Sequence, residues 1–137
     1  MRSSKTKKLA KQKADRYFSK FIRMRDANDQ GLVRCCTSGK WIHWKQSDAG
    51  HYISRRFEAT RYDERNCHAQ SKQENRFHNG NQLQHQKYIE ERYGEGTAEK
   101  LFVKSRMKCF RKKHDYEAIA EEYYNKVKNI ESKLPNL

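Results

Sequence analysis

Apolar residues recur every three or four positions near both ends of the chain, a spacing typical of amphipathic helices. Near the N-terminus these positions are Ala10, Ala14, Tyr17, Phe21 and Met24, with Phe18 and Ile22 beside them. Near the C-terminus, after Asp115 as the expected cap, they are Ile119, Tyr123, Val127, Ile130 and Leu134. The pattern predicts a basic helix within residues 1–29 and further helices within residues 96–137.

The middle of the chain, residues 31–95, has a different pattern. Short β-prone runs occupy residues 32–36, 41–44 and 51–53, with turn residues at 38–39 and 47–48. A charged loop, a short helix, a longer helix and a helix capped by Thr97 are expected at residues 54–65, 71–78, 83–94 and 97–105. Short strands followed by helices favour an α+β fold over a parallel sheet, organised as a single domain over residues 1–137.

Composition limits what this chain can be. Its 137 residues suit one domain, and its 16 aromatic residues argue against a wholly disordered basic tail. No apolar stretch approaches the length of a membrane span, and the basic N-terminus lacks the apolar part of a secretory signal. The four cysteines have no disulfide-scaffold spacing, which favours a reducing cytoplasm, the host cell's if a phage encodes the protein.

The net charge of +14 is concentrated in two flanking segments. Residues 1–25 hold ten Lys and Arg against one acid, and residues 100–113 hold seven against none. Residues 31–95 are nearly balanced, with eleven basic residues against eight acidic ones. A basic run can simply be a solvated helix face, but two runs on so short a chain favour contact with a polyanion.

Residues 48–81 are rich in His, Asn and Arg, which are poor core residues. Hydrolysis of a phosphodiester needs a base of near-neutral pKa, a hard divalent cation on oxygen ligands, and positive groups that hold the backbone. His51, Asn66 and Asn75 have suitable chemistry, although a polar surface explains the same residues without any catalysis.

The segment resembles the HNH, or ββα-metal, nuclease motif, and more narrowly the phage NinG (Rap) recombination endonuclease family. The resemblance rests on Asp-Ala-Gly-His-Tyr at 48–52, Arg-Tyr-Asp-Glu-Arg-Asn at 61–66, His68, Gln70, Asn75, Gly80-Asn81 and Tyr88. It implies a ββα-metal core between the basic N- and C-terminal helices.

The resemblance also implies roles for individual residues. His51 would be the general base, Asn66 would hold its ring by a hydrogen bond, and Asn75 would be a metal ligand. Many HNH sites carry an acid directly before the base, but this chain has Gly50 there. Asp48 is the nearest acid and would reach the metal only through a bulge at Gly50. His68 is a further candidate ligand, with ordinary hydrogen bonding as its alternative.

Family members usually carry two Cys-x-x-Cys knuckles that bind a structural zinc. The matching positions here are Cys35, Ser38, Ser71 and Glu74, and one thiolate among four is too few for such a site. Cys36 and Cys67 lack knuckle spacing. We therefore expect no structural zinc, with hydrogen bonds from Ser and Glu in its place.

Four arginines next to the proposed site are candidates for phosphate contacts, with ordinary surface charge as the alternative: Arg55, Arg56, Arg61 and Arg76. No sequence-reading element is visible, so binding should depend on backbone contacts and shape.

The resulting hypothesis is a Mg²⁺- or Mn²⁺-dependent DNA endonuclease acting on branched recombination intermediates, such as Holliday junctions or D-loops. The substrate is implied by the resemblance alone, and symmetric cleavage would suit a homodimer. The alternatives are a non-catalytic DNA-binding recombination accessory with a degenerate HNH site, and an RNA- or ribosome-associated basic protein.

Overall fold

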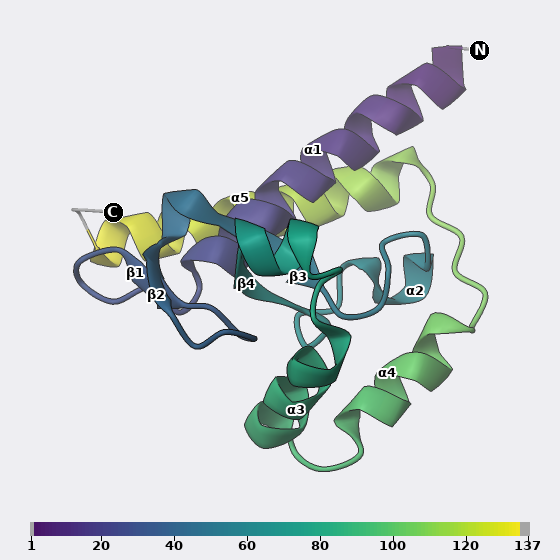
Figure 1. The fold of residues 1–137 in the computed structure, drawn as a ribbon. Helices are drawn as coiled ribbons and strands as arrows, with labels where there is room; N and C mark the ends of the chain where they lie inside the picture. Colours follow the sequence, from purple (N-terminus) through teal and green to yellow (C-terminus); the bar gives the residue numbers. More distant parts are fainter. Residues whose placement is uncertain (1, 135–137) are drawn as a thin grey trace.

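In the computed structural model, which describes residues 2–134, two long helices pack along each other (Figure 1). They are α1 (Arg2–Met24) and α5 (Lys113–Lys133). Both predicted apolar stripes are confirmed in outline, since Ala14 and Phe21 of α1 and Tyr123 and Val127 of α5 are buried. The expected ends at residues 1 and 135–137 lie outside the described residues.

The α1 stripe is wider than its periodicity indicates. Phe18 and Ile22 are almost fully buried, whereas Tyr17 is only partly buried. The Phe18 ring meets the ring of Tyr123 edge-on at 4.9 Å and that of Tyr62 at 5.5 Å. The helix is therefore covered on two sides, by α5 and by the middle of the chain.

Two small antiparallel sheets form the middle. Strand β1 (Leu32–Arg34) pairs with β2 (Trp41–His43), and β3 (Ser47–His51) pairs with β4 (Cys67–Ser71). The fold thus confirms the α+β prediction. The third strand was misplaced, since β3 begins at Ser47 where a turn was expected and ends at His51. Strand β4 was missed altogether.

Strand β4 escaped prediction because its burial does not depend on apolar side chains. His68 and Gln70 are buried as deeply as Cys67. The Gln70 amide donates to Thr37 Oγ1 and to the Gly80 carbonyl, both at 2.9 Å. A polar residue with internal partners can replace an apolar one in the interior, and this leaves no alternating pattern in the sequence.

Short helices connect and cover the sheets. They are η1 (Trp44–Gln46), α2 (Glu58–Arg61), the single-turn π-helix η2 (Gln73–Phe77), α3 (Gln82–Tyr93) and α4 (Thr97–Ser105). Two apolar residues of the predicted helices do not pack inward: Leu83 is 64% exposed and Phe102 is 52% exposed. The expected caps are displaced too, since Gly96 occupies the cap position before Thr97, and Asp115 accepts from the Lys112 amide from within the first turn of α5.

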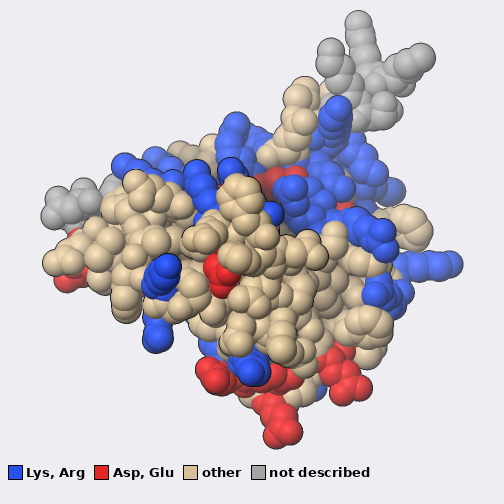
Figure 2. Space-filling view, viewed as in Figure 1, with Lys and Arg blue, Asp and Glu red and all other residues tan. Residues whose placement is uncertain are grey.

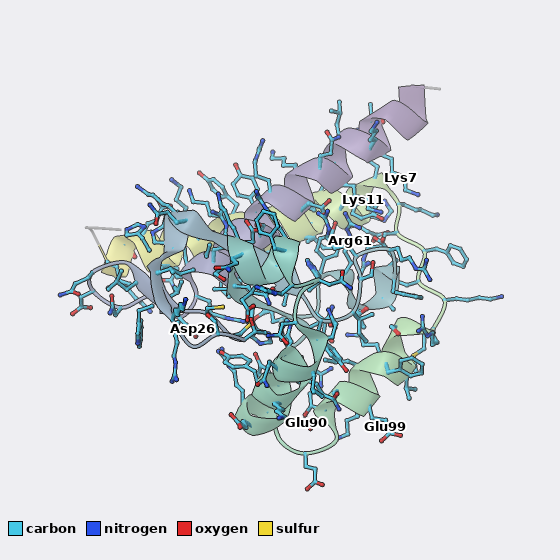
Figure 3. The ribbon with its side chains drawn as sticks, viewed as in Figure 1. Lys7, Lys11, Asp26, Arg61, Glu90 and Glu99 are labelled. Carbon is cyan, nitrogen blue, oxygen red and sulfur yellow. The ribbon has the colours of Figure 1, made fainter. Side chains whose placement is uncertain are left out.

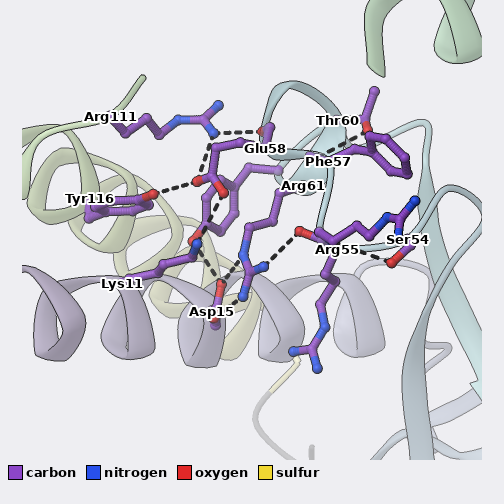
Figure 4. A network of polar contacts seen from close by, with 12 residues as sticks. Lys11, Asp15, Ser54, Arg55, Phe57, Glu58, Thr60, Arg61, Arg111 and Tyr116 are labelled. Atoms are coloured by element: carbon purple, nitrogen blue, oxygen red, sulfur yellow. Dashed lines mark hydrogen bonds and ion pairs between the residues drawn. The ribbon is translucent and has the colours of Figure 1, made fainter. Parts of the chain in front are cut away.

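The segment between β3 and β4, which contains the short helix α2 and is called the loop 52–66 below, is held against the two long helices by ion pairs (Figure 4). Arg61 forms a bidentate pair with Asp15 of α1, with N–O distances of 2.9 and 2.6 Å. Burial alone would raise the pKa of Asp15, but hydrogen bonds from Arg61 and Tyr62 hold it below its ordinary value. Glu58 accepts from Lys11 of α1, from Arg111 in the segment before α5, and from Tyr116 in the first turn of α5.

A buried pair of histidines joins α3 to β4. His68 Nδ1 lies 3.0 Å from His85 Nε2, and His68 Nε2 lies 2.8 Å from the Tyr93 hydroxyl. Burial lowers the pKa of both imidazoles, and each is lowered further by another histidine. Both rings are therefore neutral in the folded protein at neutral pH.

None of the helices in the described part of the chain combines the length and the apolar character that a membrane span needs.

We predict that this histidine pair makes stability sensitive to mild acid. The pKa of each is lower in the folded chain, so its contribution is complete above about pH 6.5 and declines as the pH falls toward the folded value. The slope is about 1.4 kcal/mol per pH unit for each histidine while only the unfolded chain is protonated. Urea unfolding between pH 7 and 5 measures this slope. His85→Gln should reduce it and the exposed His114→Gln should not; equal slopes in both variants would refute the assignment.

Candidate active site

A polar pocket of about 590 Å³ opens between α1, β3, η2 and the loop before α2. Six residues predicted from the sequence border it: Asp48, His51, Arg55, Arg61, Asn75 and Arg76. They come from β3, from the loop 52–66, and from η2, the helix that follows β4. The fold therefore gathers most of the predicted site at one place.

His51 ends strand β3 and is held from both ring nitrogens. Its Nε2 donates to the Arg61 carbonyl at 3.0 Å, and its Nδ1 lies 3.6 Å from Cys67 Sγ. Burial lowers the pKa of His51 to about 4, and this outweighs the opposing effect of the hydrogen bond to Arg61. At neutral pH the ring is thus uncharged, with its proton on Nε2 and a lone pair on Nδ1.

Asn66 does not hold the His51 ring, so this expected hydrogen bond is wrong. Its side chain is fully buried, and Oδ1 accepts from the Ile53 amide at 2.8 Å. Its Nδ2 donates to the carbonyls of Ile53 and Thr60. Asn66 therefore shapes the loop that carries the Arg61 carbonyl, and its influence on His51 is indirect.

Asp48 and Asn75 meet directly across the pocket. Asn75 Nδ2 donates to Asp48 Oδ2 at 3.0 Å, and Arg76 Nε donates to the same oxygen at 3.1 Å. The expected bulge at Gly50 is absent, since β3 and β4 pair in regular register from Ser47 to His51. Asp48 still borders the pocket, because it faces η2 while His51 faces α1 and the loop 52–66.

One carboxylate and one amide form a donor set suited to a hard divalent cation. Mg²⁺ commonly takes one or two protein oxygens and completes its octahedron with water and phosphate. Asn75 now presents Nδ2 to Asp48, so its amide would have to turn to offer Oδ1. Among the described residues, no cluster of three or more His, Cys, Asp and Glu side chains forms a metal site.

His68, the further candidate ligand, lies outside the pocket. It is buried against His85 and Tyr93 on the α3 side of β4, where hydrogen bonds to both account for its position.

The four candidate arginines differ in their partners. Arg61 is bound to Asp15 and Arg76 to Asp48, while Arg55 borders the pocket and forms no ion pair with the part of the chain that the structure describes. Arg56 is exposed against the Phe57 ring, and it is not among the pocket-lining residues.

Three cations of the pocket wall were missed from the sequence: Arg23, Lys45 and Lys72. None forms an ion pair within residues 2–134. Helical periodicity does put Arg23 on the polar face of α1, where the sequence indicates only general contact with a polyanion. Figure 2 shows Lys and Arg gathered over α1, with acidic residues at the opposite end. Figure 3 places Lys7, Lys11 and Arg61 on the side of α1, and it places Glu90 and Glu99 on the side of α3 and α4.

The four zinc-knuckle positions lie near one another although three are not cysteine. Cys35 Sγ accepts from the amides of Ser38 and Ser71 at 3.4 and 3.3 Å, and Ser71 Oγ accepts from the Glu74 amide. These hydrogen bonds lower the pKa of Cys35 to about 7 against the effect of burial. The sulfur thus links β1 to the end of β4 through backbone amides.

The fold and pocket define a small, basic α+β protein with a cationic polar cleft. The family described as "Bacteriophage Lambda NinG protein" matches residues 1–133. The chain therefore belongs to the NinG family. No curated protein and no solved structure matches it.

Gly50 is required by its neighbour in β4, which gives a physical reason for the missing acid before His51. A Cβ at this position would overlap Gln70 Oε1, and the Gln70 amide is fixed by Thr37 and Gly80. We predict that Gly50→Ala lowers the free energy of unfolding by about 1–3 kcal/mol through overpacking.

Chemical denaturation of the single and double variants tests this prediction. In a Gln70→Ala background the obstructing amide is gone, so Gly50→Ala should be less costly there than in the parent chain. Strictly additive effects would contradict the proposed clash.

Proposed function

We propose that the protein is a metal-dependent DNA endonuclease with an HNH-type site, acting on branched recombination intermediates. One observation supports this most: a neutral imidazole, a carboxylate and an amide border one cationic pocket of about 590 Å³. They lie on β3 and on η2, which follows β4, and this is the order of elements in a ββα-metal motif. Membership of the NinG family suggests a phage function related to recombination.

His51 is proposed as the general base. The Arg61 carbonyl fixes the proton on Nε2, so Nδ1 carries the lone pair. Nδ1 would accept a proton from the attacking water once the Cys67 thiol, 3.6 Å away, yields this position. The low pKa ensures that the ring is uncharged over the whole physiological range. The Cys67 thiol beside Nδ1 is itself protonated, because burial raises its pKa to about 12.

Asp48 and Asn75 are proposed to hold Mg²⁺ or Mn²⁺ through their oxygens. When bound, the cation would supply charge stabilisation at the phosphate and the leaving oxygen. Arg76, more than half exposed, is the group that must yield its place on Asp48.

The unpaired cations would hold the phosphate backbone. Arg23, Lys45, Arg55 and Lys72 border the pocket without ion pairs within the described residues, so they can take a polyanion without breaking an ion pair. Arg61 is already bound to Asp15 and is better suited to shaping the loop. Binding through such contacts weakens steeply with salt.

A non-catalytic DNA-binding accessory is the second candidate, and the pairing within the pocket favours it. Asp48 Oδ2 accepts from both Asn75 and Arg76, so the proposed metal ligands satisfy each other. In that case the cationic pocket would bind DNA without cleaving it.

We predict metal-dependent nicking of a four-way junction, measured against a linear duplex with Mg²⁺, Mn²⁺ or EDTA. His51→Ala should lower the rate at least 100-fold, as expected for loss of a general base, while the exposed His114→Ala should leave it unchanged. Asp48→Asn and Asn75→Ala should also lower the rate and raise the metal concentration needed. Circular dichroism establishes that each variant is folded.

Tight junction binding without cleavage under any metal would favour the accessory. Cleavage that persists in folded His51→Ala would refute the proposed base. Tighter binding to structured RNA than to branched DNA would favour an RNA-associated protein instead.

A further inference from the structure

A second surface of the protein joins exposed aromatic rings to positive charge. We call it the aromatic–basic patch and define it by Phe57, Phe102 and Arg106, which are in contact, and by Phe110 of the segment that follows Arg106. The Arg106 guanidinium lies 4.1 Å from the Phe57 ring and 4.5 Å from the Phe102 ring, so one cation contacts two rings. Arg111 donates to the Glu58 carbonyl at 2.7 Å. Segment 106–111 is therefore anchored at both ends beside the start of α2.

The rings of the patch do not serve the hydrophobic core. Phe110 is 87% exposed and Phe102 is 52% exposed, and Val103 and Met107 next to them are also more than half exposed. Exposed apolar side chains concentrated in one segment mark an interaction site. Burial in the hydrophobic core does not account for Phe102 and Phe110, which is a reason to look for a partner.

The charge around the patch restricts the kind of partner. Residues 100–113 hold seven Lys and Arg and no acid. Lys104 and Arg111 are paired with Asp63 and Glu58, whereas Lys108 and Lys112 are exposed and form no ion pair within the described chain. A partner must therefore combine flat apolar faces with dense negative charge. Single-stranded DNA does so, because its bases stack on aromatic rings while cations hold its phosphates.

The patch also adjoins the proposed active site. Phe57 follows Arg55 and Arg56 along the chain, and Arg55 borders the pocket. A strand whose phosphate enters the pocket could thus extend past Arg56 onto the rings.

We propose that the aromatic–basic patch binds unpaired bases of a DNA strand next to the scissile phosphate. This inference rests on the proposed function. Stacking on unpaired bases would give the preference for branched DNA a physical cause. Unpaired bases occur at opened branch points and at gaps, whereas a closed duplex hides their faces. The preference for branched DNA would then come from stacking on Phe102 and Phe110.

Binding in EDTA tests the patch without any cleavage. Fluorescence anisotropy of a labelled oligothymidine and of a matched duplex gives the two dissociation constants. Phe110→Leu keeps an apolar side chain but removes the aromatic face, and it should weaken single-strand binding about 5- to 150-fold while duplex binding changes little. Phe110→Tyr should restore it. Trp41→Leu is the matched control, an exposed aromatic on β2 at the far side from α4 (Figure 1).

An abasic oligonucleotide of equal length separates stacking from other contacts. If bases stack on Phe110, the Phe110→Leu change should have little further effect on the abasic strand. An equal loss on both strands, an equal loss for Trp41→Leu, or unchanged binding in both Phe110→Leu and Phe102→Leu would overturn the proposal. Because no metal is present, failure here is distinct from failure of the nuclease assay.

Discussion

The bidentate ion pair between Asp15 and Arg61 is the contact on which the rest of the site depends. It fixes the loop 52–66 against α1 at N–O distances of 2.9 and 2.6 Å, and Tyr62 adds a hydrogen bond to the same carboxylate. The Arg61 carbonyl then stands where it accepts a hydrogen bond from His51 Nε2. Breaking such a half-buried pair would leave an uncompensated charge and release the wall of the pocket. One acid in the basic N-terminal segment thus organises the His51 ring, its tautomer and the pocket wall.

Ion pairing also distinguishes structural cations from those available to a polyanion. The acids Glu58, Asp63 and Glu64 of the loop 52–66 bind basic side chains of α1, α4 and α5, or of the segment before α5. The cations around the pocket that form no ion pair with the described residues, such as Arg23 and Arg55, are a small share of the total. A formal charge of +14 therefore overstates the positive charge that a polyanion would meet at any one place.

The sequence predicted those parts of the structure whose burial depends on apolar spacing. Both long helices and the α+β class follow from this spacing. The resemblance selected Asp48, His51 and Asn75, and in the fold these three residues border one pocket. Strand β4 could not be found in this way, because His68 and Gln70 are buried through hydrogen bonds to distant residues. Asn66 was misread for the same reason, since its partners are the backbone of Ile53 and Thr60. Such partners are known only once the chain is folded.

Phe18 belongs at once to the hydrophobic core and to the wall of the pocket. Its ring packs on Tyr123 and Tyr62, and its centroid lies 6.2 Å from that of His51. In a larger protein a rigid scaffold can separate a polar site from the packing that holds it. In this chain α1 serves both purposes, so a substitution selected for tighter packing is also a change to the surroundings of His51. Stability and the properties of the pocket are therefore expected to evolve together, with few positions free to alter one alone.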